Sequence, residues 1–326
     1  MSPRVLFLVA GAGEASCRFR VLQYLPHLQR RGIATHVADL HVPLGRRRRL
    51  LLSAAEYDVV CVHRVLLTAI EQRWLQRVAP RYIFDFDDAI MFRDSQRQRF
   101  VSWQRRHRFA RMVAGAHRVI AGNRYLADAA FRYTDRVTVI PTAIDLTPYP
   151  NPPHRSRDPV IGWIGTRANL MYLRAVLPAL ARLSRTRPEI TLKIVADDFF
   201  DGPHLRIIKK PWSLEDEVAD VTSFQVGIMP LPDDPWTRGK CAVKILQYFA
   251  AAVPVVCSPV GTNLDVVEHG RSGYFATADD EWVNYLDDLL GNAERRTQFG
   301  AAGRETVRQR YSIEATLDAL ITALLE

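Results

Sequence analysis

Short apolar runs alternate with longer amphipathic stretches in the first half of the chain. The apolar runs predict buried strands at residues 5–10, 33–40, 57–63, 82–86, 118–121 and 137–140. Between them, apolar residues recur at helical spacing, which predicts helices at residues 19–31, 66–78 and 126–133. Strands that alternate with helices imply a parallel sheet with helices on both faces.

The same alternation starts again after a proline-rich stretch. Six of the residues from Pro141 to Pro159 are proline, a density that ends regular structure. The pattern then predicts strands at residues 160–164, 191–196, 226–229 and 254–257 and helices at 173–183 and 242–251. We therefore expect an α/β protein with two tandem Rossmann-like, doubly wound domains that face a cleft, residues 1–150 and 151–326. Whether the C-terminal helix crosses back and packs on the first domain is left open by the pattern.

Composition narrows the class of protein. The chain has 326 residues, of which 48% are hydrophobic and 24% charged, which is typical of a globular protein. The four cysteines form no metal-binding or disulfide pattern, so a reducing cytoplasm is expected. The first apolar run is short for a signal peptide, and no run reaches the roughly 18 apolar residues of a membrane span. We expect a cytoplasmic protein, either soluble or peripheral on the inner face of the cell membrane.

Charge is divided unevenly along the chain. Residues 1–157 hold 26 arginines, no lysine and 12 acidic residues, a net charge of +14, whereas residues 158–326 hold 18 basic and 23 acidic residues, a net charge of −5. Such asymmetry indicates an anionic partner for the first half, for example a membrane surface. No nucleic-acid-binding motif accompanies the charge, so nucleic acid is not expected.

Two arginine clusters carry much of this charge. Arg46 to Arg49 precede three leucines, and residues 97–111 predict an arginine-rich helix. An apolar stripe runs along that helix through Phe100, Trp103, His107, Ala110 and Ala114. The pattern fits either an interfacial helix on a membrane or a surface helix whose stripe faces the core.

The segment from Asp233 to Gly261 carries the strongest chemical signal. A glycine-containing loop opens a helix there, and such a helix start suits a phosphate. Arg238, Lys240 and Lys244 add cations, and the two lysines are four residues apart, so we expect both to reach the same side of the helix. The alternative is a solvated basic helix end.

Several motifs together resemble one enzyme family. They are Lys244-Ile-Leu-Gln-Tyr-Phe-Ala-Ala-Ala-Val-Pro-Val-Val, Ser258-Pro-Val-Gly, Glu268-His-Gly-Arg-Ser-Gly, Gly122-Asn-Arg-Tyr-Leu-Ala, Val139-Ile-Pro-Thr-Ala-Ile-Asp and Ile161-Gly-Trp-Ile-Gly. As a set they resemble the donor-site signature of retaining glycosyltransferases of family 4, which have the GT-B fold. The resemblance implies transfer of a sugar from a nucleotide sugar, held mainly by the C-terminal domain, with retention at the anomeric carbon and without metal or cofactor. The acceptor would be a glycan, a lipid-linked compound or a small molecule.

The chain departs from the family pattern at the donor site. Gly239 and Gln247 stand where the family has two glutamates, and the family's cations near the start of the second domain are missing. Glutamine can still bind a ribose hydroxyl, and Asp233 or Asp234 is the expected substitute for the lost carboxylate. The donor-binding residues implied by the resemblance, with these substitutes, are Gly165, Thr166, Arg167, Asp233, Asp234, Arg238, Gly239, Lys240, Lys244 and Gln247.

Three carboxylates follow one another in Asp85-Phe-Asp-Asp88, at the carboxyl end of a predicted parallel strand. Open α/β sheets place ligands at this edge. We expect Asp87 and Asp88 to be catalytic by orienting the acceptor hydroxyl, and Asp85 to cap a helix or pair with an arginine. One alternative is a DxD metal site, and another is a purely structural role for all three.

Two further loops are candidates for the acceptor side. A glycine turn before a helix contributes Gly11, Gly13, Arg18 and Arg20, and Arg64 follows another predicted strand. His63, its neighbour, is expected to be a packed histidine. Two competing functions remain beside sugar transfer: a GT-B-like sugar-nucleotide epimerase and a non-catalytic protein that binds sugar nucleotides.

Overall fold

The computed structural model describes residues 2–79, 81–97, 99–150, 158–202 and 204–326, arranged in two compact units. The first unit comprises Met1–Ala143, Asp234–Cys241 and Ile313–Glu326, and the second comprises Ile144–Asp233 and Ala242–Ser312. Pro152 and Pro153 of the predicted proline-rich boundary lie outside the described residues.

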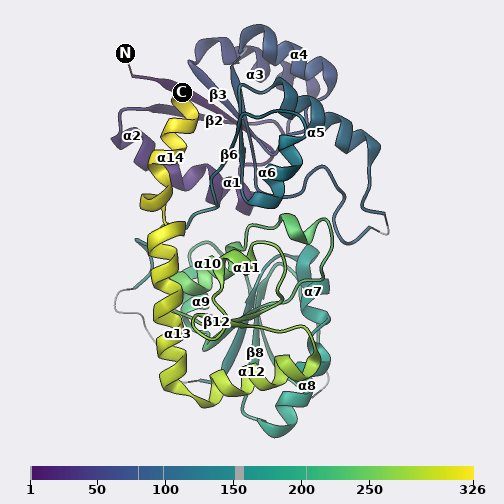
Figure 1. Ribbon diagram of the computed structural model, residues 1–326, viewed down its shortest axis with the longest axis vertical. Coiled ribbons are helices and arrows are strands. Elements are labelled where there is room, and N and C mark those ends of the chain that lie inside the picture. Colours follow the sequence, from purple (N-terminus) through teal and green to yellow (C-terminus); the bar gives the residue numbers. More distant parts are fainter. Residues whose placement is uncertain (1, 80, 98, 151–157, 203) are drawn as a thin grey trace. The chain divides into compact units, whose positions relative to one another are not determined.

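The first unit is built on a parallel sheet of six strands in the order β2-β1-β3-β4-β5-β6 (Figure 1). The strands are β1 (Arg4–Val9), β2 (Ala34–Asp39), β3 (Val59–His63), β4 (Tyr82–Phe86), β5 (Arg118–Ala121) and β6 (Val137–Val139). The helices are α1 (Ala15–Arg20), η1 (Leu22–Tyr24), α2 (Leu25–Arg30), α3 (Leu44–Leu52), η2 (Ser53–Glu56), α4 (Ala69–Val78), α5 (Trp103–Gly115), α6 (Arg124–Phe131), η4 (Thr237–Gly239) and α14 (Ile313–Leu325).

The second unit is also built on a parallel sheet of six strands, but in a different order, β12-β11-β10-β7-β8-β9: two strands lie outward of its first strand, where the first unit has one. Its strands are β7 (Val160–Ile164), β8 (Thr191–Ala196), β9 (Arg206–Pro211), β10 (Val226–Met229), β11 (Val255–Cys257) and β12 (Gly273–Phe275). Its helices are η3 (Arg167–Asn169), α7 (Leu170–Arg174), α8 (Leu177–Thr186), α9 (Glu217–Thr222), α10 (Val243–Ala250), α11 (Asn263–Val266), α12 (Asp279–Gly291), α13 (Ala293–Thr306) and η5 (Val307–Tyr311).

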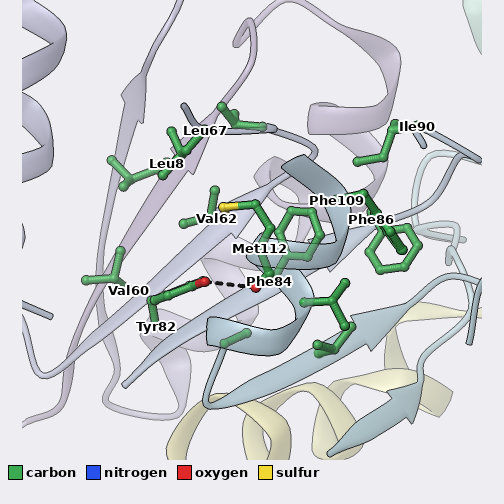
Figure 2. Packing of buried hydrophobic residues seen from close by; sticks show 14 of the residues in the cluster. Leu8, Val60, Val62, Leu67, Tyr82, Phe84, Phe86, Ile90, Phe109 and Met112 are labelled. Atoms are coloured by element: carbon green, nitrogen blue, oxygen red, sulfur yellow. Dashed lines mark hydrogen bonds between the residues drawn. The ribbon is translucent and has the colours of Figure 1, made fainter. Parts of the chain in front are cut away.

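Strand β4 separates two apolar layers in the first unit. Tyr82, Phe84 and Phe86 point to one face, where they join Phe109 and Met112 of α5 in a buried cluster (Figure 2). The Tyr82 hydroxyl donates a 2.8 Å hydrogen bond to the Met112 carbonyl oxygen, so the polar end of this core side chain is satisfied. The residues between them, Ile83 and Asp85, point to the other face, because successive side chains of a strand alternate.

The C-terminal helix α14, yellow in Figure 1, belongs to the first unit. Its apolar residues Ile313, Leu317 and Leu320 complete the core on the second face of the sheet. The hydroxyls of Tyr24 and Thr316 are 2.7 Å apart and buried, and they join α14 to the N-terminal helices by a hydrogen bond.

Most predicted strands are confirmed, but three predicted helices are wrong in extent. Residues 173–183 are divided between α7 and α8, and the helix predicted at 97–111 begins only at Trp103, after the N-cap Ser102. Residues 19–31 do not form one continuous helix: α1 ends at Arg20, and the turn η1 separates it from α2. Pro26 lies in the first turn of α2, where its missing N–H costs no hydrogen bond, so the second helix begins there.

The predicted stripe on α5 is not part of the core. Trp103 is 78% exposed and its ring stacks on that of His107, while the buried face of the helix is formed by Phe109, Met112 and Val113. All four cysteines are buried and free. Among the described residues, no helix is both long enough and apolar enough to cross a bilayer.

Candidate functional site

Each sheet has one point where the order of its strands reverses. In the first unit the chain runs from β1 outward to β2 and then returns to β3 on the other side of β1, and in the second unit it returns from β9 to β10 beside β7. In open parallel sheets, ligands bind beyond the carboxyl ends of the strands at such a point. We therefore looked for a site at each of the two reversals.

A cavity of about 580 Å³ lies at the reversal in the first unit. The loop after β1 and the start of α1 contribute Gly11, Glu14 and Ser16, and the end of β3 contributes His63 and Arg64. A cavity of this size is in the range of roughly 300–1,000 Å³ that suits a small ligand.

Other lining residues come from parts of the chain distant in sequence. Gln104, Arg105 and Arg108 of α5 line the cavity, together with Trp236. Of the described residues that line the cavity, three are arginines and one, Glu14, is acidic. The cavity is therefore polar, with an excess of positive charge.

A buried ion pair lies behind the cavity. The guanidinium of Arg20 contacts the carboxylate of Asp85, and its Nη1 donates a 2.6 Å hydrogen bond to the carbonyl oxygen of Ile140. Nδ1 of His63 is 2.6 Å from Asp85 Oδ2. Burial alone would raise the pKa of Asp85, but the Arg20 charge and the hydrogen bond from His63 lower it to about 2. The prediction that Asp85 pairs with an arginine is confirmed.

Ser16 joins this ion pair to Asp87. Its hydroxyl donates to the Asp87 carboxylate, with oxygen separations of 2.6 and 2.7 Å, and lies 2.9 Å from Nε2 of His63. An ionised carboxylate only accepts hydrogen bonds, so the single Ser16 proton goes to Asp87. The imidazole of His63 thus lies between Asp85 and Ser16, with one ring nitrogen within hydrogen-bond distance of each.

Arg64 is held at the cavity by two carboxylates. Its Nη2 is 2.9 Å from Asp88 Oδ2 and its Nε is 3.6 Å from Asp87 Oδ1. These carboxylates raise the pKa of Arg64 against the opposing effect of burial. The backbone of Arg64 has a φ of 58°, an uncommon value for a residue other than glycine, and such backbone strain is often found at functional sites.

The structure separates the predicted acceptor-side residues into two groups. Gly11 and Arg64 line the cavity. Gly13, Arg18 and Arg20 do not line it. The Arg18 guanidinium lies over the ring of Phe19, 4.1 Å from its centroid, and Arg20 is buried in its ion pair with Asp85. The expectation that Arg20 contacts a ligand is therefore wrong, because its guanidinium is already used by Asp85 and Ile140.

The two predicted catalytic residues, Asp87 and Asp88, also lie behind the wall of the cavity. Neither carboxylate lines it, and both contact Arg64, which does. Burial opposes ionisation of Asp87, but Arg64 and His63 lower its pKa, so it is a carboxylate. The three carboxylates that a DxD metal site would use are thus paired with Arg20 and Arg64. In the described part of the chain, no cluster of three or more metal-ligating side chains is found.

Part of the predicted donor loop, Asp234–Cys241, packs in the first unit. Asn123 donates through Nδ2 to the carbonyl oxygen of Gly239 at 3.1 Å, and the Tyr125 hydroxyl donates to that of Pro235 at 3.1 Å. A Cβ at position 239 would lie 2.6 Å from Cβ of Ala89. This close approach leaves no room for a side chain at position 239.

Asp234 is occupied within this loop. Its Oδ1 accepts hydrogen bonds from the backbone N–H groups of Trp236 and Thr237 at 2.9 and 2.8 Å, and its Oδ2 accepts from Ser95 at 2.7 Å. The carboxylate therefore closes a turn, and its expected role as a substitute for the lost glutamate is not supported.

The two lysines of the donor segment do not share a helix. Helix α10 begins at Val243, so Lys244 is helical while Lys240 has extended backbone before the helix. The expected one-turn spacing is wrong, because Ala242 takes a left-handed φ of 54° that redirects the chain between them. Lys240 Nζ lies 5.6 Å from the Trp236 ring centroid in the first unit, and Lys244 Nζ lies 5.5 Å from that of Trp163 in the second.

The remaining donor candidates belong to the second unit and flank its strand reversal. Gly165, Thr166 and Arg167 follow β7, and Asp233 follows β10. A Cβ at Gly165 would lie 3.0 Å from Cε of Lys244, so the lysine side chain passes directly over this glycine. Arg167 is exposed, and its Nε is 3.3 Å from Asp198.

Gln247 has a buried polar group without a partner. The residue is 4% exposed, and its Nε2 has no hydrogen-bond partner among the residues that the structure describes. A buried donor left unpaired costs about 1–3 kcal/mol, so a ligand that accepts a hydrogen bond there would be favoured.

Sequence reasoning missed several residues that line the cavity. Ser16, Gln104, Arg105, Arg108 and Trp236 were not singled out as site residues, and they come from three separate parts of the chain. Trp236 lies in the segment from Asp233 to Gly261. An aromatic residue close in sequence to Arg238 and Lys240 was the signal that could have identified it. The α5 residues had no such signal, because which face of an arginine-rich helix borders a cavity depends on the tertiary fold.

The second unit matches a known family, and the whole chain matches known structures. Residues 158–292 match the family model described as "Glycosyl transferases group 1". A comparison with curated proteins found no match.

Three solved structures illustrate the similarity of fold. HepE from Anabaena has a TM-score of 0.71 at 14% identity, and sucrose-phosphate synthase from Thermosynechococcus elongatus has 0.74 at 14%, each over 98% of both chains. A glycosyltransferase from Rickettsia africae has a TM-score of 0.70 at 11% identity, over 98% of this chain and 97% of its own. The chain therefore has the GT-B fold, and the predicted fold class is confirmed.

We expect Asp85→Asn to lower the free energy of unfolding at pH 7 by about 3–5 kcal/mol, because it leaves a buried Arg20 charge without its partner. The pKa of Asp85 is lower in the folded state than its unfolded value of about 3.9, so its stabilisation is complete above that pH and is lost as the pH falls toward about 2. Urea unfolding at a series of pH values should show the difference between wild type and variant shrinking below about pH 4.

Asp128→Asn is the matched control, because Asp128 is exposed on α6 in the same unit. It should stay within about 0.5 kcal/mol of wild type. Equal stability of the two variants would contradict the assignment of the ion pair.

Proposed function

We propose that the protein is a glycosyltransferase that moves a sugar from a nucleoside diphosphate to a hydroxyl group of an acceptor. The observation that carries this proposal is the match of residues 158–292 to the glycosyltransferase family model in a chain with the GT-B fold. HepE, one of the similar structures, was solved in complex with UDP and glucose, which supports a nucleotide sugar as the donor. We place the reaction in glycan or glycolipid synthesis.

The donor would bind at the strand reversal of the second unit. The loop after β7 contains Gly165. Because this residue has no side chain, the Lys244 side chain can lie against the backbone of the loop. We propose that Lys244 contacts the diphosphate and that Gln247 donates to a ribose hydroxyl, which would satisfy its unpaired Nε2. Thr166, Arg167 and Asp233 remain donor-side candidates on the same two loops.

Arg238, Gly239 and Lys240 stay predictions on the donor side. They belong to a loop that packs with the first unit, and they immediately precede α10 along the chain. Lys240 is the one for which we keep a phosphate contact, through a charge-assisted hydrogen bond.

The chemistry would be electrostatic. As the bond between sugar and diphosphate breaks, negative charge grows on the leaving phosphate, and the Lys244 ammonium would stabilise it. We propose that the sugar keeps its anomeric configuration, with the acceptor proton passing to the leaving phosphate. Asp87 would then position groups at the reaction centre, through Ser16 and Arg64, without taking the proton itself.

The first test is nucleotide binding. Lys244→Gln and Lys240→Gln should each weaken UDP, ADP or GDP binding by about 1.5–3 kcal/mol, the range for hydrogen bonds to charged groups. Isothermal titration with these three nucleotides measures it. Lys209→Gln is the control, since Lys209 lies on edge strand β9 and pairs with Asp201. If both variants bind as wild type does, the phosphate assignment is lost.

The second test is turnover. Asp87→Asn should lower kcat for release of nucleoside diphosphate from the nucleotide sugar by about 100-fold, the lower end of the range for acid–base groups, while the KM for donor stays close to wild type. EDTA should not change the rate of wild type. Asp128→Asn again serves as the exposed control.

Two results of this assay would contradict the proposal. Full kcat in both Asp87→Asn and Asp88→Asn, with native thermal stability, would leave these carboxylates with a structural role. An altered sugar on the nucleotide without release of nucleoside diphosphate would indicate an epimerase.

We also propose that the start of α5 contacts an anionic membrane surface. Trp103 is 78% exposed at the start of α5, and Arg97 and Arg99, which precede the helix in sequence, are exposed as well; exposed aromatic and basic residues together favour a lipid interface. Binding to phosphatidylglycerol vesicles should be measurable by cosedimentation at low salt and should fade as salt screens the charges. Trp103→Ala should reduce it, whereas Phe131→Ala should not, since Phe131 is a comparably exposed ring on α6, 52% exposed. Equal binding of both variants would remove this surface.

A further inference from the structure

Two arginines that line the cavity of the first unit have no carboxylate partner among the described residues. Arg64 is paired with Asp87 and Asp88. Arg105 donates through Nη1 to the carbonyl oxygen of Ile90 at 3.3 Å, which leaves its charge uncompensated. Neither Arg105 nor Arg108 forms an ion pair with a carboxylate among the residues that the structure describes.

Arg105 and Arg108 are also placed to act together. They are three residues apart on α5, so their side chains leave the helix on the same side, and both line the cavity. Two adjacent guanidinium groups match the oxygens of a phosphate or a carboxylate, to which arginine donates in pairs. Unpaired arginines on an open surface would not indicate a binding site. Arg105 and Arg108, however, both line one cavity.

Other lining residues supply groups of a different kind. The Glu14 carboxylate can accept hydrogen bonds, and Trp236 adds an aromatic surface, whereas Ser16 and His63 are already hydrogen-bonded to Asp87 and Asp85. Hydroxyl-bearing ligands need several such donors and acceptors, with an apolar face to pack on. The cavity thus combines a polyol-binding side with an anion-binding side.

We propose that this cavity holds the acceptor and that the acceptor is a hydroxyl compound with a phosphate or carboxylate group, bound by Arg105 and Arg108. Its role as acceptor site rests on the proposed sugar transfer. The charged group lies on the α5 side, and the hydroxyls lie toward Glu14 and Trp236. The acceptor class is thereby narrowed from any glycan, lipid-linked compound or small molecule to anionic ones.

The test compares charged and neutral probes with the donor site saturated by UDP. The charged probes are glucose 6-phosphate, glucuronate and glycerol 3-phosphate, and the neutral ones are glucose and glycerol. At least one charged probe should bind about 10-fold or more tightly than its neutral counterpart, measured by isothermal titration. Arg108→Gln and Arg105→Gln should each weaken that binding by about 10-fold to 100-fold.

Arg106→Gln is the matched control, because Arg106 lies between the two arginines on α5 but does not line the cavity. It removes the same charge and should leave probe binding unchanged, with all variants checked for native thermal unfolding. Equal losses in Arg106→Gln and Arg108→Gln would overturn the proposal, because binding would then follow net charge alone. So would a panel in which no charged probe binds more tightly than its neutral counterpart.

Two further readouts separate the possible outcomes. Displacement of the soluble probe by vesicles of phosphatidylcholine with phosphatidylinositol would assign the anion to a lipid headgroup, and persistence of the probe would assign it to a free compound; either supports the site. If wild type fails to bind any nucleoside diphosphate while the charged probes still bind through Arg108, the proposed sugar transfer fails and the anion site stands.

Discussion

The buried contact between Asp85 and Arg20 organises the ligand edge of the first unit. A carboxylate at the end of a central strand, with less than a tenth of its surface exposed, is stable there only if a cation compensates its charge. Arg20 provides that charge from α1, and His63 adds a hydrogen bond from β3. Through Ser16 the same network fixes Asp87 and, through Asp87, Arg64. The polar floor of the cavity is thus a consequence of one compensated charge in the core.

Both sheets are parallel and six-stranded, but they differ in strand order and in where they place their chemistry. In the first unit, arginines and a hydrogen-bonded serine and histidine surround a cavity, whereas in the second a glycine loop lies under a lysine and a buried glutamine lacks a partner. Two features of the loop before α10 have local physical causes. Ala89 leaves no room for a side chain at Gly239, and the Asp234 carboxylate closes its own turn.

The strands were predictable from the sequence because buried parallel strands are continuous apolar runs. Strands β4 and β8 begin and end where the pattern placed them. The edge strand β9 was missed, since its residues Arg206–Pro211 are mostly exposed and polar. Helical spacing shows which residues share one face of α5, but it does not show whether that face is buried. In the structure the buried face is the one that contains Phe109. The cavity could not be foreseen for the same reason, because it joins Ser16 and Arg108, which are distant in sequence.

The first unit is discontinuous in sequence, and this has a consequence for biosynthesis. Its core includes Leu317 and Leu320 of α14, and its fold includes the segment Asp234–Cys241, both of which are synthesised after most of the second unit. While the ribosome is still making the second unit, one face of the first sheet lacks its last helix and exposes apolar surface. Vectorial folding from the N-terminus, the usual order for tandem domains, therefore cannot run to completion here. The first unit becomes complete only when α14 has emerged, whereas the second is complete at Ser312, so the uncovered face of the first sheet favours aggregation of the nascent chain until the end of its synthesis.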